Sequence, residues 1–558
     1  MLLSKPTSPR KVEDGFTSLR SLLLNHNGTG AVLGRRAAFT PLLLWALTLL
    51  LWLPWLGNLP LRDWDEGLVA TVARSTWQQV VEGHHPFDGL IAYKWGGAYI
   101  NKPPGLHWLI GGAVYNFGEA DWVVRLVPCL LSSLAVPLIY WLRCGLNPTP
   151  ATPDARRQRD RRALMAALIL MTLLPMARHG RLAMLDGTLL STSLLLILGW
   201  IGARHTPWKG VLAGLAATGL LMLKPPAVFG YGLIMLAISA WEQRLGISRR
   251  AWQWLGLGLT PGVAWHLWHF TWRGNDALVM WGSQGLGRIT AVVGENSGGW
   301  IMPATEVLEG GWPWLLLVPT GLQWVWRHRR EADSKWILGL FVGSALMVFP
   351  LRTQLPWYSH LLWPPIALLC GEGLNRLIED GQPRWIPRTW QTIGSGLLIL
   401  TVLTSLQDET WQLPLATTAL AGLGLLLGGG GLSAQTQFKR RRGFIALIGG
   451  WSLALIFLWH SQLWLWELNE SWDVRPLAAQ VRALPKNATV LLAGPTRPSM
   501  EWYSQRSIDQ FHESPTGQLR PFWLISNDPP QHCSATSEPT QGWRLWHCPP
   551  SLSPTSKP

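Results

Sequence analysis

The sequence predicts an all-α protein that crosses a membrane many times and carries a small α/β domain near its C-terminal end. Of its 558 residues, 48% are hydrophobic and only 14% are charged, whereas soluble proteins average about 25% charged residues. The apolar residues gather into runs of spanning length, for which a helix needs about 20 residues. The 38 tryptophans far outnumber the 7 tyrosines, and tryptophan concentrates at the membrane–water interface.

The basic residues are arranged as in a membrane protein. A formal net charge of +15 would suggest nucleic acid binding in a soluble chain. Here the lysines and arginines form short clusters between apolar runs, the pattern that orients helices in a bilayer. We therefore expect membrane lipids rather than nucleic acid as partners. The five cysteines are scattered without the spacing of a metal site, and we expect no metal centre built on them.

The apolar runs define the expected spans. Residues 1–37 are polar and basic and are expected to lie in the cytoplasm. No small-residue cleavage site follows the first run, which predicts an uncleaved span. The thirteen predicted spans are 38–56, 122–142, 163–178, 184–203, 209–223, 226–241, 252–271, 312–326, 336–350, 358–372, 390–405, 411–429 and 443–464. Residues 104–118 are apolar but short, and we interpret them as re-entrant or interfacial because a further span would break the charge alternation.

Charge alternation sets the expected orientation. Basic loops such as 143–162 and 439–442 should face the cytoplasm, which leaves the first loop, 58–121, and the C-terminal region outside. The expected domains are a transmembrane catalytic domain over 38–464, a small α/β domain over 465–527 and an irregular Pro/Ser-rich tail over 528–558. In an oxidising compartment, Cys533 and Cys548 are candidates for a disulfide.

Several charged side chains lie in the loops expected on the outer face, and the basic ones among them depart from the positive-inside rule. The first loop carries Asp63, Asp65 and Glu66 directly after the first span. Carboxylates near hydrocarbon are costly and tend to mark function, although Asp65 could instead cap a helix over 66–80. The outward basic residues either reach to headgroup phosphates or bind an anionic substrate.

Lys102 and Asp186 are two further candidate site residues. Lys102 precedes two prolines, which restrict the chain before an apolar segment, and a fixed ammonium there suits a lipid phosphate. Asp186 stands one turn into a predicted span, where it should pair with Arg178 or Arg181 or line a wet cavity. The sequence has no Walker motif and no dinucleotide-binding glycine pattern, so it shows no phosphate-binding loop for a soluble nucleotide-sugar donor.

Several motifs resemble one family of membrane enzymes. Six blocks carry the resemblance, in order: 65–74 (DEGLVATVAR), 101–109 (NKPPGLHWL), 122–128 (WVVRLVP), 181–186 (RLAMLD), 223–225 (LKP) and 355–358 (LPWY). They resemble bacterial membrane glycosyltransferases of the GT-C fold, the superfamily of the lipid A aminoarabinose transferases and the protein O-mannosyltransferases. The agreement covers residues 38 to about 372.

The resemblance implies a reaction and a set of site residues. The donor would be a polyprenyl-phosphate sugar and the acceptor a periplasmic-face lipid or glycoconjugate such as lipid A or lipopolysaccharide, in the inner membrane. No cofactor would be required, although a divalent cation at the acidic cluster stays open. The resemblance also implies that Asp65 is the catalytic carboxylate, that Lys102 contacts the donor phosphate and that Asp186 is a second acidic group. From the charged and aromatic residues of the outer loops we add Glu66 to catalysis, Arg178, Arg181, Lys224 and Arg288 to the donor phosphate, and Trp64, His107, Arg352, Trp357, Tyr358 and His360 to the substrate cavity.

The expected mechanism is a single displacement in which Asp65 accepts the proton of an acceptor hydroxyl. If the acceptor is itself a phosphate, Asp65 would instead position it or stabilise charge on the sugar. Leu68 and Val69 stand where the family usually has Arg and Tyr, which leaves the sugar open. We expect Asp65, Lys102 and Asp186 to converge in one chamber. The alternatives are an O-mannosyltransferase-like enzyme, a lipid or sugar transporter and a membrane scaffold.

Overall fold

The computed structural model divides the chain into two compact units. It describes residues 33–83, 87–244, 246–292, 299–406, 414–465, 472–511, 521–528, 533–536 and 538–549, with side chains from Phe39 onward. The helical unit comprises residues up to Trp55, Pro128–Arg181 and Leu185–Trp464. The loop–tail unit comprises Leu56–Val127, Leu182–Met184 and the chain from Leu465 onward. The expected N-terminal segment lies outside the described residues as far as residue 32.

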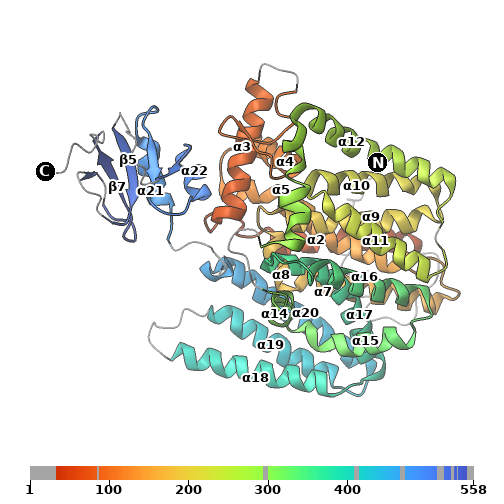
Figure 1. Ribbon diagram of the computed structural model, residues 1–558. Coiled ribbons are helices and arrows are strands. Elements are labelled where there is room, and N and C mark those ends of the chain that lie inside the picture. The colour runs from red at the N-terminus through yellow and green to blue at the C-terminus, as the bar shows by residue number, and fades with distance from the viewer. Residues whose placement is uncertain are drawn as a thin grey trace, which may run out of the picture. The chain divides into compact units, whose positions relative to one another are not determined.

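The helical unit is built from helices alone among its described residues (Figure 1). They are α2 (Leu33–Trp52), α6 (Ala135–Gly145), α7 (Pro153–Thr172), α8 (Leu174–Gly180), α9 (Leu185–Ala203), η2 (Pro207–Lys209), α10 (Gly210–Leu223), α11 (Pro226–Trp241), α12 (Arg249–Arg273), η3 (Gly274–Leu278), η4 (Gly282–Leu286), α13 (Gly287–Thr290), α14 (Met302–Gly310), η5 (Trp314–Leu317), α15 (Val318–Arg327), α16 (Ala332–Val348), η6 (Pro356–Leu362), α17 (Trp363–Asp380), α18 (Trp385–Ser405), α19 (Leu415–Leu432) and α20 (Gln437–His460). Helices α5 (Asp121–Ser133) and η7 (Gln462–Leu465) connect the two units along the chain.

Within the described residues, each predicted apolar run contains helix, because in lipid a helix satisfies its own backbone hydrogen bonds. Among the described residues, four helical segments are long and apolar enough to cross a membrane: Asp121–Gly145, Leu185–Ala203, Leu415–Leu432 and Gln437–His460. The number rises to five if the bent pair α7–α8 is one span. The thirteen predicted spans remain a prediction.

The segment around α7 differs from the prediction in two ways. Residues 153–162, expected to be loop, form the first turns of α7, where the Thr152 hydroxyl accepts a hydrogen bond from the Ala155 amide and Pro153 begins the helix. The predicted span 163–178 is broken after Thr172, and α7 and α8 meet at a bend of 62°. Pro175 lies in the first turn of α8 and supplies no amide to α7.

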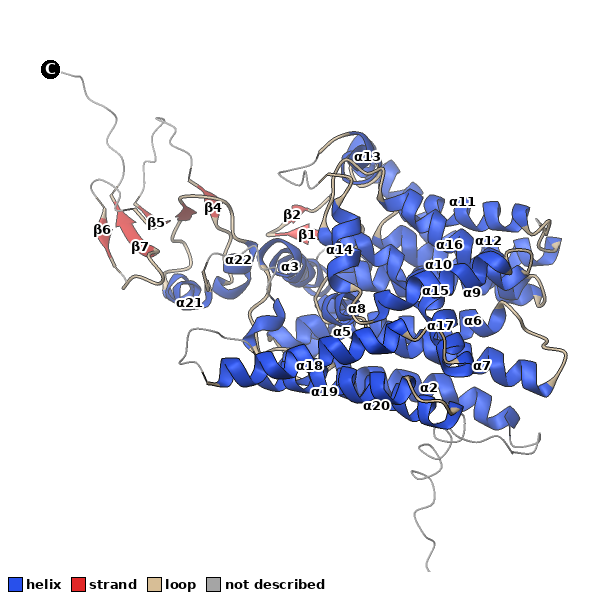
Figure 2. Ribbon diagram, turned by 90° about the horizontal axis from the view of Figure 1, so that it is seen from below, coloured by secondary structure: helices blue, strands red, loops and turns tan. Residues whose placement is uncertain are grey.

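Small residues set the closest helix contacts of the helical unit. Helices α18, α19 and α20 lie side by side in both views (Figures 1 and 2). A Cβ atom at Gly431 of α19 would lie 2.4 Å from the Cα atom of Gly443 in α20. No flexible side chain intervenes, so glycine is required for these two backbones to approach as they do.

The first part of the loop–tail unit is the outer loop predicted after the first span. It contains the short π-helix η1 (Asp63–Gly67), α3 (Leu68–Glu82), the hairpin strands β1 (Tyr93–Lys94) and β2 (Gly97–Ala98), and α4 (Gly105–Phe117). Asp65 is not a helix cap: η1 begins at Asp63, and the Glu66 carboxylate accepts from the Arg62 amide in front of it. The short apolar run at 104–118 forms α4.

The C-terminal part of the unit is an α/β fold. It contains α21 (Arg475–Ala483), β3 (Val490–Leu492), α22 (Pro498–Ser504), β4 (Asp509–Gln510), β5 (Phe522–Ser526), β6 (Ser534–Ala535) and β7 (Arg544–Cys548). Helix α21, strand β3 and helix α22 all lie within residues 465–527, the segment predicted to form a small α/β domain. The sheet has the order β4-β3-β5-β7-β6, with β3 parallel to β4 and β5, and β7 antiparallel to β5 and β6.

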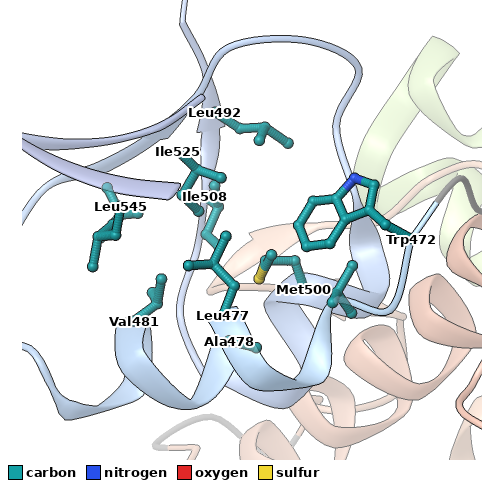
Figure 3. Close-up of a cluster of buried hydrophobic side chains, with 11 residues drawn as sticks. Trp472, Leu477, Ala478, Val481, Leu492, Met500, Ile508, Ile525 and Leu545 are labelled. Carbon is teal, nitrogen blue, oxygen red and sulfur yellow. The ribbon is translucent and has the colours of Figure 1, made fainter. Parts of the chain in front are cut away.

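The expectation that 528–558 is irregular was wrong for β6 and β7. Strand β7 pairs along the whole of β5 and sends alternate side chains to opposite faces of the sheet. Leu545 joins the core formed with α21 and α22 (Figure 3), whereas Trp546 and Cys548 join the core of the other face. Cys533 and Cys548, the pair suggested from the sequence, form a disulfide.

Candidate active site

Glu66 is the structural anchor of the first outer loop. Its carboxylate is fully buried and receives two hydrogen bonds from Arg125, at 2.8 and 2.7 Å, and others from the amides of Ala183 and Arg62. Burial alone would raise the pKa of Glu66, but the Arg125 guanidinium and these hydrogen bonds outweigh it and hold the pKa below its ordinary value. The expected catalytic role of Glu66 is therefore replaced by a structural one, because all its oxygens are engaged.

Arg125 extends this anchor to the chain before η1. Its guanidinium also donates to the carbonyl oxygens of Leu56, Leu59 and Pro60 at 2.7–2.9 Å. These bonds fix the stretch that leads into η1. Sequence reasoning missed this role, although an arginine inside an apolar block was the available signal.

Asp63 is also committed to structure. Arg497 and the Ser499 hydroxyl both donate to its carboxylate, and the Ser499 amide donates at 3.3 Å. These partners come from α22 and the residue before it, and no local sequence pattern predicts the pairing.

Asp65 is the most accessible carboxylate of η1. Its side chain is 16% exposed, against 1% for Asp63 and 0% for Glu66. Its ion pair with Arg62 is long, at 3.6 Å from Nη2 to Oδ2. The neighbouring Trp64 side chain is exposed. Of the three acidic groups, Asp65 is thus the one whose position suits contact with a substrate.

Lys102 lies just before α4, where Pro104 occupies the N-cap position. Its side chain is half-buried. His107, one turn into α4, is buried and its Nδ1 lies 3.3 Å from the Pro103 carbonyl oxygen. Burial, aided by the charge of Lys102, lowers the pKa of His107 to about 4, so at neutral pH the ring is uncharged and Nδ1–H can donate to Pro103.

In the helical unit, Asp186 and Lys224 form a loose ion pair. Asp186 lies in the first turn of α9 and Lys224 ends α10. Their Nζ and Oδ1 atoms are 3.5 Å apart, longer than the 2.7–2.9 Å typical of a charge-assisted hydrogen bond. Asp186 thus pairs with Lys224, not with the expected Arg178 or Arg181.

Tyr358 joins this pair to Arg288. The Lys224 ammonium lies 4.4 Å from the centre of the Tyr358 ring, and Arg288 Nη1 donates to the Tyr358 hydroxyl at 2.7 Å. Arg288 also donates to the Gln284 side chain at 3.0 Å, while its Nε is buried without a hydrogen-bond partner among the described residues. We call Asp186, Lys224, Arg288 and Tyr358 the Tyr358 cluster.

Two buried histidines pack beside each other in the same unit. The rings of His179 in α8 and His360 in η6 meet edge to face, with centroids 4.4 Å apart. Arg178 is buried, with Nη2 3.5 Å from the His179 ring. The adjoining backbone is fixed as well, because the amides of Arg352 and Thr353 donate to the Arg288 carbonyl. The Arg352 side chain is exposed, and Trp357 is half-buried.

Arg181 is a structural residue and does not suit the expected donor-phosphate role. Its guanidinium is fully buried and donates to the carbonyl oxygens of Trp52, Pro54 (2.8 Å) and Trp55 (3.2 Å) at the end of α2. It also lies over the rings of Trp459 and Trp464. These hydrogen bonds engage both terminal nitrogens of the guanidinium.

The described residues offer no arranged set of ligands for a divalent cation. Among the described residues, no group of three or more His, Cys, Asp or Glu side chains is arranged to hold a metal. The three carboxylates of η1 face Arg497, Arg62 and Arg125 separately. We therefore assign no reaction step to a metal.

Comparisons with known proteins agree with the fold. The family model of dolichyl-phosphate-mannose-protein mannosyltransferases matches residues 84–280. Undecaprenyl phosphate-alpha-4-amino-4-deoxy-L-arabinose arabinosyl transferase 1 of Pseudomonas fluorescens is 25% identical over 314 residues, 53% of this chain and 54% of the relative. The corresponding transferase of Pseudomonas aeruginosa is 26% identical over 391 residues, 67% of this chain and 64% of the relative. The matched stretches thus span about half to two thirds of these relatives.

A solved structure matches over nearly its whole length. The crystal structure of ArnT from Cupriavidus metallidurans, bound to undecaprenyl phosphate, superposes with a TM-score of 0.69 and covers 91% of this chain and 97% of that one at 15% sequence identity. Its apo form matches equally well, with a TM-score of 0.69. The chain therefore has the fold of these ArnT structures, in agreement with the GT-C fold expected from the sequence.

Proposed function

We propose that the protein is an integral-membrane glycosyltransferase that moves a sugar from a polyprenyl-phosphate donor to an acceptor at the outer membrane face. The relatives are named for transfer from undecaprenyl phosphate, and a solved neighbour contains that lipid. Lipid A, lipopolysaccharide or another envelope glycoconjugate is the proposed acceptor. The proposal includes thirteen spans, a cytoplasmic N-terminus and a periplasmic C-terminus.

The Tyr358 cluster is the observation that carries this proposal. Lys224 and Arg288 both contact Tyr358, and the one carboxylate of the cluster, Asp186, pairs with Lys224. The four groups together therefore carry one excess positive charge in a largely buried setting, which attracts an anion strongly. The loose Lys224–Asp186 contact leaves the ammonium able to turn toward a phosphate, and Arg288 Nε still lacks a partner among the described residues.

Charge develops on the donor phosphate as the sugar leaves. Lys224 and Arg288 would neutralise it, with the Tyr358 hydroxyl as a further donor. Contacts that strengthen as charge develops lower the barrier, and the loss of one such donor typically costs about 10²–10³ in rate. Asp186 keeps Lys224 in place before the donor binds.

Asp65 would act on the acceptor. It is the accessible carboxylate of a segment whose other two acids are held in ion pairs. For a hydroxyl acceptor it takes the proton as the oxygen attacks the sugar carbon. The bond from that carbon to the phosphate oxygen breaks in the same step, and the carbon inverts. For a phosphate acceptor, Asp65 instead orients the acceptor or stabilises the positively charged sugar ring.

Lys102 is a further proposed phosphate contact, and the two prolines that follow it limit its backbone. Glu66 and Arg181 are left out of the reacting set because structural partners bind both oxygens of Glu66 and both terminal nitrogens of Arg181. Their roles are to hold the loop before η1 and the end of α2, respectively.

The match to the mannosyltransferase family model favours a second candidate, transfer of mannose to protein hydroxyl groups. The two functions differ in donor and acceptor. Purified full-length protein, given a polyprenyl-phosphate aminoarabinose or a polyprenyl-phosphate mannose, should transfer sugar from one donor and not the other. Mass spectrometry of envelope lipids and proteins from cells with and without the protein would identify the acceptor. If neither the lipid fraction nor the protein fraction loses a glycan, and neither donor supports transfer, both functions would be contradicted.

A further inference from the structure

The basic run at the start of α20, Lys439 to Arg442, has no part in the proposed reaction. Arg440 is explained by structure: its guanidinium donates to the carbonyl oxygens of Ile378, Glu379, Ala434 and Gln435 at 2.6–3.1 Å. The other three cations of the run need a different explanation.

A groove lies between α19 and α20 at this basic end. Its volume is about 460 Å³, within the range of small-ligand pockets. Its lining combines small apolar residues with two cations: Leu427, Gly430, Gly431, Ala434, Lys439, Arg442, Gly443 and Ala446. The close approach of Gly431 and Gly443 forms the groove, because larger side chains there would hold the helices apart.

The two cations share one side of α20. Lys439 and Arg442 are three residues apart and therefore neighbours on the helix surface, and both are exposed. Arg442 lies over the Phe438 ring at 4.6 Å. Among the described residues, neither cation forms an ion pair with a carboxylate. The mouth of the groove is thus positively charged, and its walls are apolar.

The same end of α20 carries further positive charge outside the groove lining, at Arg441 and the nearby Arg161. Arg441 is 4% exposed, and its Nε and Nη2 have no hydrogen-bond partner among the described residues. The nearby Arg161 has an unpartnered Nε and one ion pair, with Glu379 at 3.0 Å. Buried donors without partners are costly and in native structures are usually met by water or an ion. The positive end of the α20 dipole favours a negative charge there as well.

We propose that the basic end of the α19–α20 pair binds one anionic phospholipid. Its phosphate contacts Lys439 and Arg442, and one acyl chain lies along Leu427, Gly430 and Ala446. Both helices meet the length and composition of membrane spans, so apolar walls below an interfacial pair of cations match a lipid in shape and polarity. Basic pockets between spanning helices are known sites for anionic headgroups.

The test is native mass spectrometry of the full-length protein after incubation with phosphatidylglycerol or phosphatidylcholine. The wild type should retain phosphatidylglycerol in preference to phosphatidylcholine. The double variant Lys439→Gln/Arg442→Gln should bind phosphatidylglycerol roughly tenfold or more weakly, since each cation near a charged headgroup contributes about 1 kcal/mol. Arg249→Gln/Arg250→Gln is the matched control: it removes two exposed cations from the start of α12 and should leave binding unchanged.

A second variant separates the lipid from a free anion. A Cβ at Gly430 would meet only the Gln391 side chain, at 3.4 Å, so Gly430→Leu fills the groove without a backbone clash. It should abolish lipid retention while leaving the helical content unchanged. Equal loss in both double variants would mean general surface electrostatics and would overturn the proposal. Inorganic phosphate that displaces phosphatidylglycerol completely, or full retention of it by Gly430→Leu, would do the same.

Discussion

Arg497 donates a hydrogen bond to Asp63, a residue 434 positions earlier in the chain. The contact is one of several between α22 and the first outer loop within the loop–tail unit. The Ser499 hydroxyl binds the same carboxylate, the Tyr503 hydroxyl donates to Asp121 at 3.0 Å, and Lys94 pairs with Glu501 at 2.7 Å. Asp63 is two residues from Asp65, so the C-terminal α/β fold holds the segment that carries the proposed reacting carboxylate.

We predict that Arg497→Ala lowers kcat for sugar transfer about tenfold or more, with little change in the donor KM. The variant leaves the buried Asp63 carboxylate short of a partner and loosens η1 without touching the donor phosphate. Arg497→Lys, which retains the charge, should recover part of the rate. Arg482→Ala removes an exposed arginine of α21 and is the control. A folding defect would also lower the apparent kcat, so the rate is taken per correctly folded protein; a wild-type kcat for Arg497→Ala on that basis would contradict the positioning role.

Gly67→Ala should also weaken the packing of η1 against α22, here through a change in η1. A Cβ atom at Gly67 would lie 2.6 Å from the backbone nitrogen of Ser499 and 2.7 Å from its Cα atom, and backbone atoms cannot turn aside as a flexible side chain can. We expect a loss of stability of about 1–3 kcal/mol and faster limited proteolysis of the C-terminal region. Gly96→Ala, where a Cβ would meet nothing within 4 Å but φ is +79°, controls for backbone strain alone.

Lys224→Met and Arg288→Gln should chiefly affect the polyprenyl-phosphate donor. Each removes one cation from the Tyr358 cluster, and we expect transfer from the donor to fall about 10²–10³-fold. Lys335→Met, at a half-buried position of α16 outside the Tyr358 cluster, is the control. Steady-state kinetics with the donor varied would check this, and an unchanged kcat/KM for both variants would remove the cluster from the phosphate site.

The Glu66–Arg125 pair predicts a pH dependence of stability. The pKa of Glu66 is lowered in the folded protein, so the pair's contribution is present above the ordinary glutamate pKa and is lost as pH falls through the lowered value. At neutral pH, Glu66→Gln should cost about 3 kcal/mol, because Arg125 stays buried. Thermal unfolding in detergent should show the gap between wild type and Glu66→Gln narrowing as pH falls below 4.5. A gap that is independent of pH would show that charge pairing is not the cause.

The sequence predicted the helices better than their connections. Apolar runs locate the helices because lipid leaves the backbone few alternatives. Pro175 could have indicated the break between α7 and α8, but composition alone merges the two into one span. Strand β7 was missed because prolines and serines dominate the tail around a short segment, 544–548, whose pairing with β5 is long-range.

The sequence predicted which types of residue form the site better than it predicted which residues they contact. Lys224, Arg288, Tyr358 and Asp186 come together in the helical unit, from elements far apart in the chain. Glu66 and Arg181 were assigned to chemistry because a charged residue at a membrane face signals function. Only their contacts reveal them as structural, since Arg125 and the three carbonyl oxygens at the end of α2 belong to other elements. The pairing of Asp63 with Arg497 likewise depends on the fold of the whole loop–tail unit.

The most direct test of the account is the rate of a single turnover by Asp65→Asn with a saturating polyprenyl-phosphate sugar donor. Asp154→Asn, an exposed carboxylate at the start of α7, controls for the loss of one acid. The account predicts donor binding close to that of the wild type and sugar transfer slower by about 10²–10⁴-fold, the usual contribution of a general base. Transfer by Asp65→Asn at the wild-type rate, from correctly inserted protein, would contradict it.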